Sequence, residues 1–204
     1  MCVMSKTQQP YHHGDLRATL LNAAKQRLES QGIEGLSLRK IAEDAGVSRT
    51  APYHHFKDKN ALLSAIAAEG FEQWHREAQI IFDDESLTPE ERLKRFIRGY
   101  VGYADRHPQM YELMFGRTIW KSGEPTADLK AVAFPSFQFQ VTMTKTWQAQ
   151  GLLPQDQDTL RLAQVTWSTL HGIARLLIDG IYADSSHIDA MCDCAAQLFM
   201  RRPD

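Results

Sequence analysis

The chain has 204 residues, of which 43% are apolar, and its formal net charge at pH 7 is −2. That length and apolar content are typical of a globular protein with one large or two small cores, which argues against a disordered chain. No run of eighteen apolar residues occurs, so we expect no membrane-spanning helix. The first thirty residues lack a secretory apolar segment, and the three cysteines lack disulfide-framework spacing, so we expect a cytoplasmic protein with reduced thiols.

The charge is unevenly distributed along the chain. Residues 1–62 contain 9 Lys or Arg against 6 Asp or Glu, whereas residues 63–204 contain 14 against 19. This asymmetry fits a basic, nucleic-acid-binding part attached to an acidic body.

Residues 15–32 predict the first helix. Its apolar residues recur at helical spacing and mark a buried side, and Gly32 ends it. They are Leu16, Leu20, Leu21, Ala24 and Leu28.

Residues 37–59 predict two short helices separated by Gly46-Val47-Ser48. In the first helix, apolar residues at helical spacing follow Ser37, the expected N-cap, and Gly46 is the expected stop. Such a short connection makes the two helices cross steeply, which is typical of a helix-turn-helix that reaches into a DNA major groove. A small helical hairpin with a purely structural role is the alternative.

We expect Ser48 to cap the second helix, with Ala51 and Phe56 turned toward the core. Pro52 would be its fourth helical residue and loses only the first intrahelical hydrogen bond, so the helix is expected to survive.

The order Ser37-x-x-x-Ile41-Ala42, Gly46-Val47-Ser48, Tyr53-x-His55-Phe56-x-x-Lys59 resembles the DNA-binding domain of the TetR family of bacterial transcriptional regulators. The resemblance covers residues 11 to about 65, and Pro52 replaces the usual bulky aliphatic residue. The segments 10–17 and 167–172 are similar to a subgroup with a Trp, His, Gly signature in its C-terminal domain. From the pattern and the resemblance together, the residues expected to contact DNA are Arg39, Ser48, Arg49, Thr50, Tyr53, His54, His55 and Lys59.

The rest of the chain is also predicted to be helical. We expect helices at residues 60–82, 88–106, 108–115, 128–150, 156–180 and 186–201, with Pro135 kinking the fourth of these or delaying its start. The predicted fold is therefore all-α, with a three-helix DNA-binding domain at residues 11–60 and a helical effector-binding and dimerisation domain at residues 61–204.

The middle helices are rich in aromatic residues. The resemblance implies that such residues line a small-molecule pocket, whereas aromatic residues at helical spacing also form ordinary cores. His171 is either an effector contact or a hydrogen-bonded core residue. The candidate pocket residues are Trp74, Tyr103, Tyr111, Phe115, Phe137, Met143, Trp147 and His171.

The predicted helix at residues 156–180 has only a narrow polar strip, so two of its sides should be buried. One side, including Val165, would face its own core, and the other would face a partner subunit in a four-helix bundle. A fully internal helix of a monomer is the alternative. The candidate interface residues are Trp167, Ala174, Ile178, Met191, Ala195 and Leu198.

These observations favour a homodimeric repressor that a small-molecule effector releases from a double-stranded DNA operator. The alternative is a helical enzyme or adaptor whose helix-turn-helix is only structural. Neither a phosphate-binding glycine loop, nor a nucleophile elbow, nor metal-ligand spacing occurs in the sequence, so we expect no enzyme activity, cofactor or metal.

Overall fold

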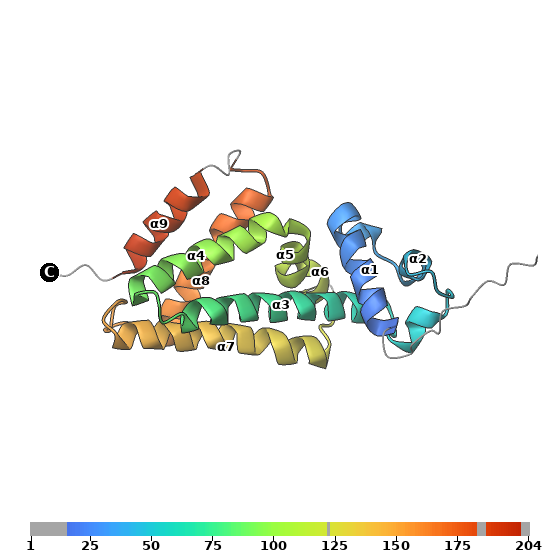
Figure 1. Ribbon diagram of the computed structural model, residues 1–204, viewed down its shortest axis with the longest axis horizontal. Coiled ribbons are helices and arrows are strands. Elements are labelled where there is room, and N and C mark those ends of the chain that lie inside the picture. The colour runs from blue at the N-terminus through green and yellow to red at the C-terminus, as the bar shows by residue number, and fades with distance from the viewer. Residues whose placement is uncertain (1–15, 122, 183–186, 201–204) are drawn as a thin grey trace, which may run out of the picture. The chain divides into compact units, whose positions relative to one another are not determined.

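The computed structural model of the protein describes residues 16–121, 123–182 and 187–200. Over these ranges the chain is helical and contains no strand, as the sequence predicts (Figure 1). The elements in chain order are α1 (Leu16–Gln31), η1 (Ile33–Gly35), α2 (Leu38–Asp44), η2 (Ala51–His54), α3 (Lys59–Asp83), α4 (Pro89–Arg106), α5 (Pro108–Phe115), α6 (Arg117–Trp120), α7 (Ala127–Ala149), α8 (Thr159–Ile178) and α9 (Ile188–Phe199). The chain divides into two compact units between Leu62 and Leu63, two residues beyond the predicted boundary.

The first unit is built by burying the apolar sides of α1 and α2. Leu20, Leu28 and Ile41 are fully buried, and Phe56 joins them from the segment after η2. Outside this core, Arg27 of α1 holds Asp44 of α2 with two hydrogen bonds, Nε to Oδ2 and Nη2 to Oδ1, both 2.6 Å long. A bidentate ion pair of this kind fixes the orientation of the two helices as well as their separation.

A glycine turn ends α2. Gly46 has φ of 66°, its N–H donates to the Glu43 carbonyl at 3.1 Å, and the N–H of Val47 donates to the Ala42 carbonyl at 2.9 Å. This pair of bonds is a Schellman motif, which requires a left-handed residue that glycine supplies without steric strain. At the other end of α2, the Ser37 hydroxyl accepts the N–H of Lys40. The predicted cap and stop are both confirmed.

The segment after this turn differs from the prediction. Instead of an α-helix capped by Ser48, residues 51–54 form the short 3-10 turn η2. Pro52 has no N–H to donate to the Ser48 carbonyl, which accepts the N–H of Ala51 at 3.0 Å instead. The Ser48 hydroxyl lies 3.2 Å from the Thr50 hydroxyl and caps no helix.

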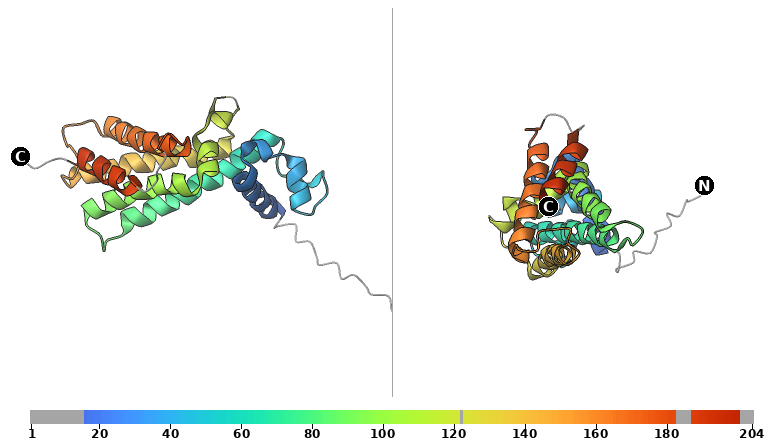
Figure 2. Two further views of the ribbon diagram at one scale, coloured as in Figure 1. Left: turned by 90° about the horizontal axis from the view of Figure 1, so that it is seen from above. Right: turned by 90° about the vertical axis from the view of Figure 1, so that its left-hand side faces the viewer.

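The second unit is a packed set of long helices. α4 packs against α8 and α9, and α7 packs against α8 (Figures 1 and 2). α4 starts with the predicted Thr88 cap, which forms a capping box with Glu91. α7 starts at Ala127, so Pro135 lies inside this helix and does not delay its start. No helix in the described residues is both long enough and apolar enough to cross a membrane.

Replacement of Gly46 by alanine should destabilise the protein. An added Cβ would meet no atom within 4 Å, so the whole cost comes from the left-handed backbone, about 1–2 kcal/mol. Gly46→Asn should cost less, because asparagine tolerates this conformation. Urea unfolding of both variants measures the difference, and equal stability of the native and Gly46→Ala proteins would contradict the account.

The Arg27–Asp44 ion pair should stabilise the protein in a pH-dependent way. The hydrogen bonds from Arg27 hold the pKa of Asp44 below its ordinary value, about 3.9. The stabilisation is therefore complete above that value and is lost as the pH falls through the lower, folded-state pKa. Arg27→Met should lower the urea midpoint at pH 7 and have less effect below pH 4. The control is Arg76→Met, which breaks only the exposed pair with Glu72 and should leave the midpoint unchanged.

Candidate functional site

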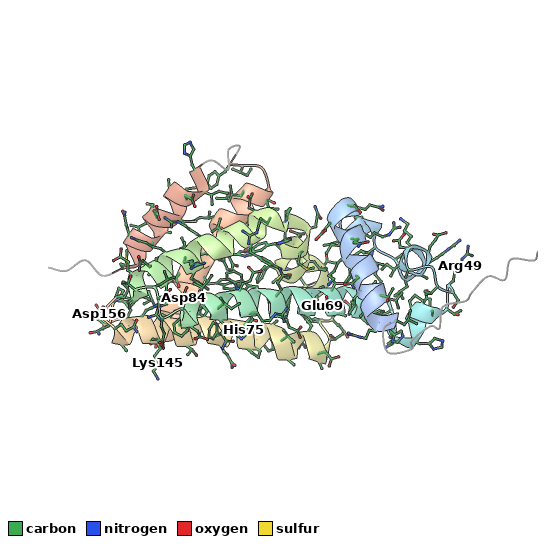
Figure 3. The ribbon with its side chains drawn as sticks, viewed as in Figure 1. Arg49, Glu69, His75, Asp84, Lys145 and Asp156 are labelled. Atoms are coloured by element: carbon green, nitrogen blue, oxygen red, sulfur yellow. The ribbon has the colours of Figure 1, made fainter. Side chains whose placement is uncertain are left out.

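The residues predicted to contact DNA lie in and around η2. Tyr53 and His54 belong to η2, and His55 follows it directly. Arg39 is on α2, and Lys59 is the first residue of α3. Ser48, Arg49 and Thr50 form the turn between α2 and η2, where Figure 3 labels Arg49. All eight side chains are exposed, with Tyr53 at 57%.

Two buried residues hold this segment in place from behind. Pro52 and Phe56 are both buried, whereas Tyr53 between them is exposed. The N–H of Phe56 donates to the Pro52 carbonyl at 2.9 Å, and the guanidinium of Arg17 lies over the Phe56 ring at 5.7 Å. The backbone is therefore fixed by apolar contacts on one side while polar side chains remain free to meet a partner on the other.

The second unit contains a cavity of about 280 Å³ with a mostly aromatic wall. Six helices contribute to it, from α3 to α8. Its lining residues are Phe71, Trp74, Tyr100, Phe115, Trp120, Ala133, Phe134, Ser136, Phe137, Gln140 and Trp167. A concave apolar space with a few polar groups is the usual form of a small-molecule site.

Three of the predicted pocket residues, Trp74, Phe115 and Phe137, line this cavity. The other five lie elsewhere. Tyr103 and Met143 are buried in the core, Trp147 lines a smaller space between α4, α7 and α8, and Tyr111 and His171 lie behind the cavity wall. Periodicity did identify the buried aromatic faces, but it could not show which of them surround an empty space.

The other wall residues were not among the predicted pocket residues. Tyr100, Trp120 and Phe134 do belong to the aromatic residues of the middle helices that the resemblance places around a pocket, whereas Trp167 was assigned to a subunit interface. Gln140 gave no signal, although a buried amide on α7 could have been suspected from its place among aromatic residues.

Two residues of the cavity wall and two behind it form a hydrogen-bonded relay. Nε1 of Trp167 donates to the Tyr100 hydroxyl at 2.8 Å, and the hydroxyls of Tyr100 and Tyr111 lie 2.9 Å apart. The Tyr111 hydroxyl lies 2.6 Å from Nδ1 of His171. Burial raises the pKa of both tyrosine hydroxyls, so both are neutral near pH 7. The relay thus joins the cavity wall to His171 through uncharged groups.

His171 ends this relay beside an ion pair. Arg175, one turn further along α8, pairs with Glu112 of α5 and with Asp179, the latter at 2.7 Å. Burial lowers the pKa of His171, the nearby Arg175 lowers it further, and Glu112 opposes them. His171 is therefore neutral near pH 7, as suits a hydrogen-bonded structural residue.

No metal-ligating cluster of three His, Cys, Asp or Glu side chains occurs in the described part of the chain. The pair His12-His13 and Cys2 lie outside it. Cys192 and Cys194 are free thiols, the first buried and the second exposed, and burial raises the pKa of the Cys192 thiol to about 11. A thiol with that pKa is a poor nucleophile at neutral pH.

Two protein-family models match the chain. The model for bacterial regulatory proteins of the tetR family matches residues 20–66, and the tetracyclin repressor-like C-terminal domain matches residues 93–199, about half of the chain. The chain belongs to the TetR family. Members of this family are DNA-binding transcription factors and not enzymes, which supports the regulator interpretation over the enzyme or adaptor alternative.

The chain is also similar to individual proteins and solved structures. A Rhodococcus sp. RHA1 structure of unknown function is 33% identical, covers 94% of this chain and 97% of its own, and has a TM-score of 0.81. FadR of Bacillus subtilis, solved with stearoyl-CoA, covers 89% of this chain and 96% of its own at a TM-score of 0.66, but is only 15% identical, which shows the fold alone. The Escherichia coli tetracycline repressor class A is 39% identical over 67 residues, 33% of this chain and 31% of the repressor. Matches to such curated relatives span between about a quarter and a half of their length.

In this TetR-family chain, some residues of α8 face the side opposite to the predicted one. Ala174, predicted to meet a partner, is buried within its own unit, as is Leu170 one turn before it. Val165, predicted to face the core, is 61% exposed. Periodicity identifies two apolar arcs on α8, but only packing against α4 and α7 decides which arc faces inward.

The other predicted interface residues are buried in part and exposed in part. Ala195 is buried, so its assignment to an interface is wrong, as is that of Ala174. Trp167 lies in the cavity wall and bonds Tyr100. Ile178 and Met191 are half-buried, and Leu198 is 76% exposed.

Proposed function

We propose that this TetR-family protein is a homodimeric repressor that binds a pseudo-palindromic DNA operator in the cytoplasm and leaves it when a small-molecule effector fills the aromatic cavity. The observation that carries the proposal is the set of eight exposed side chains around η2, anchored from behind by buried Pro52 and Phe56. A rigid backbone that presents polar groups on one side suits recognition of base edges and phosphates.

Within this segment the residues have different proposed roles. Arg49, Thr50 and Tyr53 lie in the turn and in η2, the part expected to enter the major groove, so they are assigned to base edges and nearby phosphates. Lys59 and Arg39 carry positive charge at the edges of the segment, which suits phosphate contacts. Lys59 also starts α3, where the N-terminal helix dipole favours an anion.

The same helix supports the link between the effector and DNA. α3 carries Phe71 and Trp74 of the cavity wall and begins at Lys59. An effector that displaces the wall residues of α3 would move the start of this helix, and with it the spacing of two DNA-binding segments in a dimer. We also propose membership of the subgroup with a Trp, His, Gly signature, on the residues of segment 167–172, in which Trp167 and His171 are the two ends of the relay.

The dimer is proposed to form through the exposed apolar surface of α8 and α9. Of the large apolar side chains that are exposed in the second unit, Leu160 and Val165 lie on α8, Ile181 and Tyr182 follow it, and Leu198 lies on α9. Apolar side chains gathered on neighbouring elements are typical of a subunit interface, because a monomer leaves them in water. One copy of this surface can pair with another around a two-fold axis.

Binding to the DNA upstream of the protein's own gene should weaken steeply with salt. If three or four phosphates are held per subunit, the slope of log affinity against log salt should be about −5 to −7, at roughly 0.9 per phosphate. Lys59→Ala should weaken binding to all sequences equally, whereas Arg49→Ala should change base preference by about 1–3 kcal/mol. Electrophoretic mobility shifts and selection from a random pool measure these effects.

The control for these variants is Lys145→Ala, which removes the same charge from an exposed position on α7 in the other unit (Figure 3). It should leave affinity and salt slope unchanged. Equal binding to operator and random DNA at 0.2 M salt would refute the regulator proposal.

Val165→Glu and Leu198→Glu should each convert the dimer to a monomer without unfolding it. Both positions are exposed in the single chain, so a charge there costs the fold little but would be buried unpaired in the interface. Ile80→Glu is the matched control, because Ile80 is also exposed, at 71%, but lies on α3. Sedimentation velocity measures the outcome, and dimers of unchanged strength in both variants would exclude this surface.

A further inference from the structure

The cavity has the composition of a site for an uncharged ligand. No charged side chain lines it among the residues that the structure describes, and eight of its eleven lining residues are aromatic. A carboxylate group entering this space would lose its hydration without gaining an ion-pair partner, which is strongly unfavourable. Flat aromatic molecules, in contrast, gain ring contacts on every side.

The volume indicates what size of molecule the cavity can hold. An apolar cavity of about 150 Å³ holds benzene, and this one has about 280 Å³. The space therefore suits a molecule of about two fused rings.

Hydrogen counting fixes the direction of the relay at the wall. Trp167 can only donate, so the Tyr100 oxygen accepts from it. If Tyr100 then donates to Tyr111, and Tyr111 donates to Nδ1 of His171, every hydrogen of the relay is used. In the reverse direction the Tyr100 O–H has no acceptor among the described residues, and Tyr100 is only 3% exposed. An unpaired buried hydroxyl is costly, so the first direction is the resting one.

This direction decides which polar group a ligand can offer. In the resting relay the hydrogen of Tyr100 is already committed to Tyr111, and its oxygen keeps one free lone pair. Tyr100 and Trp167 both line the cavity. A hydrogen-bond donor on the ligand can therefore bond to the Tyr100 oxygen while the relay keeps its direction. A ligand that offers only an acceptor requires the relay to reverse, with the proton of His171 on Nδ1.

We propose that the cavity selects uncharged aromatic molecules of about two rings that carry one hydrogen-bond donor, which the Tyr100 oxygen accepts. This inference rests on the proposed function of the cavity as the effector site. It adds the chemical class of the effector and the residue that recognises its polar group.

The test compares three naphthalene probes by titration calorimetry on the full-length protein without DNA. 2-Naphthol offers a donor, 2-methoxynaphthalene only an acceptor, and 2-naphthoate a negative charge. Since a net hydrogen bond contributes about 0.5–1.5 kcal/mol, 2-naphthol should bind about 2- to 13-fold more tightly than the methoxy probe, and 2-naphthoate should bind too weakly to measure. Equal affinity of the first two probes, tight binding of 2-naphthoate, or no binding by any probe would overturn the proposal.

Two tyrosines of α4 provide the matched variants. Tyr100→Phe should abolish the preference for 2-naphthol over the methoxy probe. Tyr103→Phe should keep it, because the Tyr103 hydroxyl is also buried but faces the Gly70 carbonyl and the Met114 sulfur away from the relay. Circular dichroism checks that both variants fold. A preference that survives Tyr100→Phe would contradict the assignment, even if that variant proves less stable.

The preference should also depend on pH, because protonated His171 must donate to Tyr111 and reverse the relay. The charged groups facing His171 are Glu112 on α5 and Arg175 on α8, and the hydroxyl of Tyr111 completes its polar surroundings. Burial and Arg175 hold the pKa of His171 below its ordinary value, about 6.5. The affinity ratio of 2-naphthol to the methoxy probe should therefore be constant from pH 8 to about 6.5 and fall below it. A ratio independent of pH down to 5 would overturn the relay argument.

Calorimetry together with the DNA-binding assay separates this proposal from the proposed function. If 2-naphthol binds with the expected preference but never affects DNA binding, the ligand class stands and the effector role of the cavity fails. If the protein binds its operator and is released only by charged compounds, the regulator stands and the ligand class is wrong.

Discussion

The backbone hydrogen bonds of α3 run without interruption from Lys59 to Asp83, across the division between the two compact units. Leu62 and Ile66 are one turn apart and fully buried, yet they belong to different units. Because a helix rises about 1.5 Å per residue, Phe71 in the cavity wall lies about 18 Å along the axis from Lys59. This continuity of α3 is the physical basis of the proposed communication between effector and DNA.

The aromatic rings of the cavity wall pack on one another as well as around the space. Trp74 contacts the rings of Phe96, Tyr100 and Tyr103 at centroid distances between 5.3 and 5.8 Å. On the wall itself, the indole N–H of Trp120 is bonded to the Met114 carbonyl at 2.6 Å. Groups whose hydrogen bonds are already satisfied within the protein give the cavity few ways to adapt to a charged ligand, since each would have to leave its partner.

The two polar regions of the protein therefore differ in kind. Around η2 the polar side chains are exposed and carry net positive charge, so their energetics with DNA depend on salt and on released counterions. The polar groups of the relay at the cavity wall are neutral and are hydrogen-bonded one to the next. Their interaction energy with a ligand therefore depends on the position of single protons. A regulator needs both kinds of contact, because its operator is a polyanion and its effector, as proposed, is uncharged.

The sequence by itself determined most of the long helices and several of their ends. Ser37, Gly46 and Thr88 act through the backbone of their own or the adjacent turn, and such local interactions are readable from residue order. Pro52 is a local feature too, but its missing N–H favours a 3-10 turn more strongly than we expected.

Only the tertiary structure decided which apolar arc of α8 faces inward, and which aromatic residues surround a space. Val165 and Leu170 have the same apolar character and helical context, and packing against α4 and α7 leaves the first in water and buries the second. Likewise, Trp167 of α8 meets Tyr100 of α4, 67 residues earlier in the chain, because these two helices pack together. Periodicity reports that a face is buried, but the identity of its neighbours depends on long-range packing that no local pattern encodes.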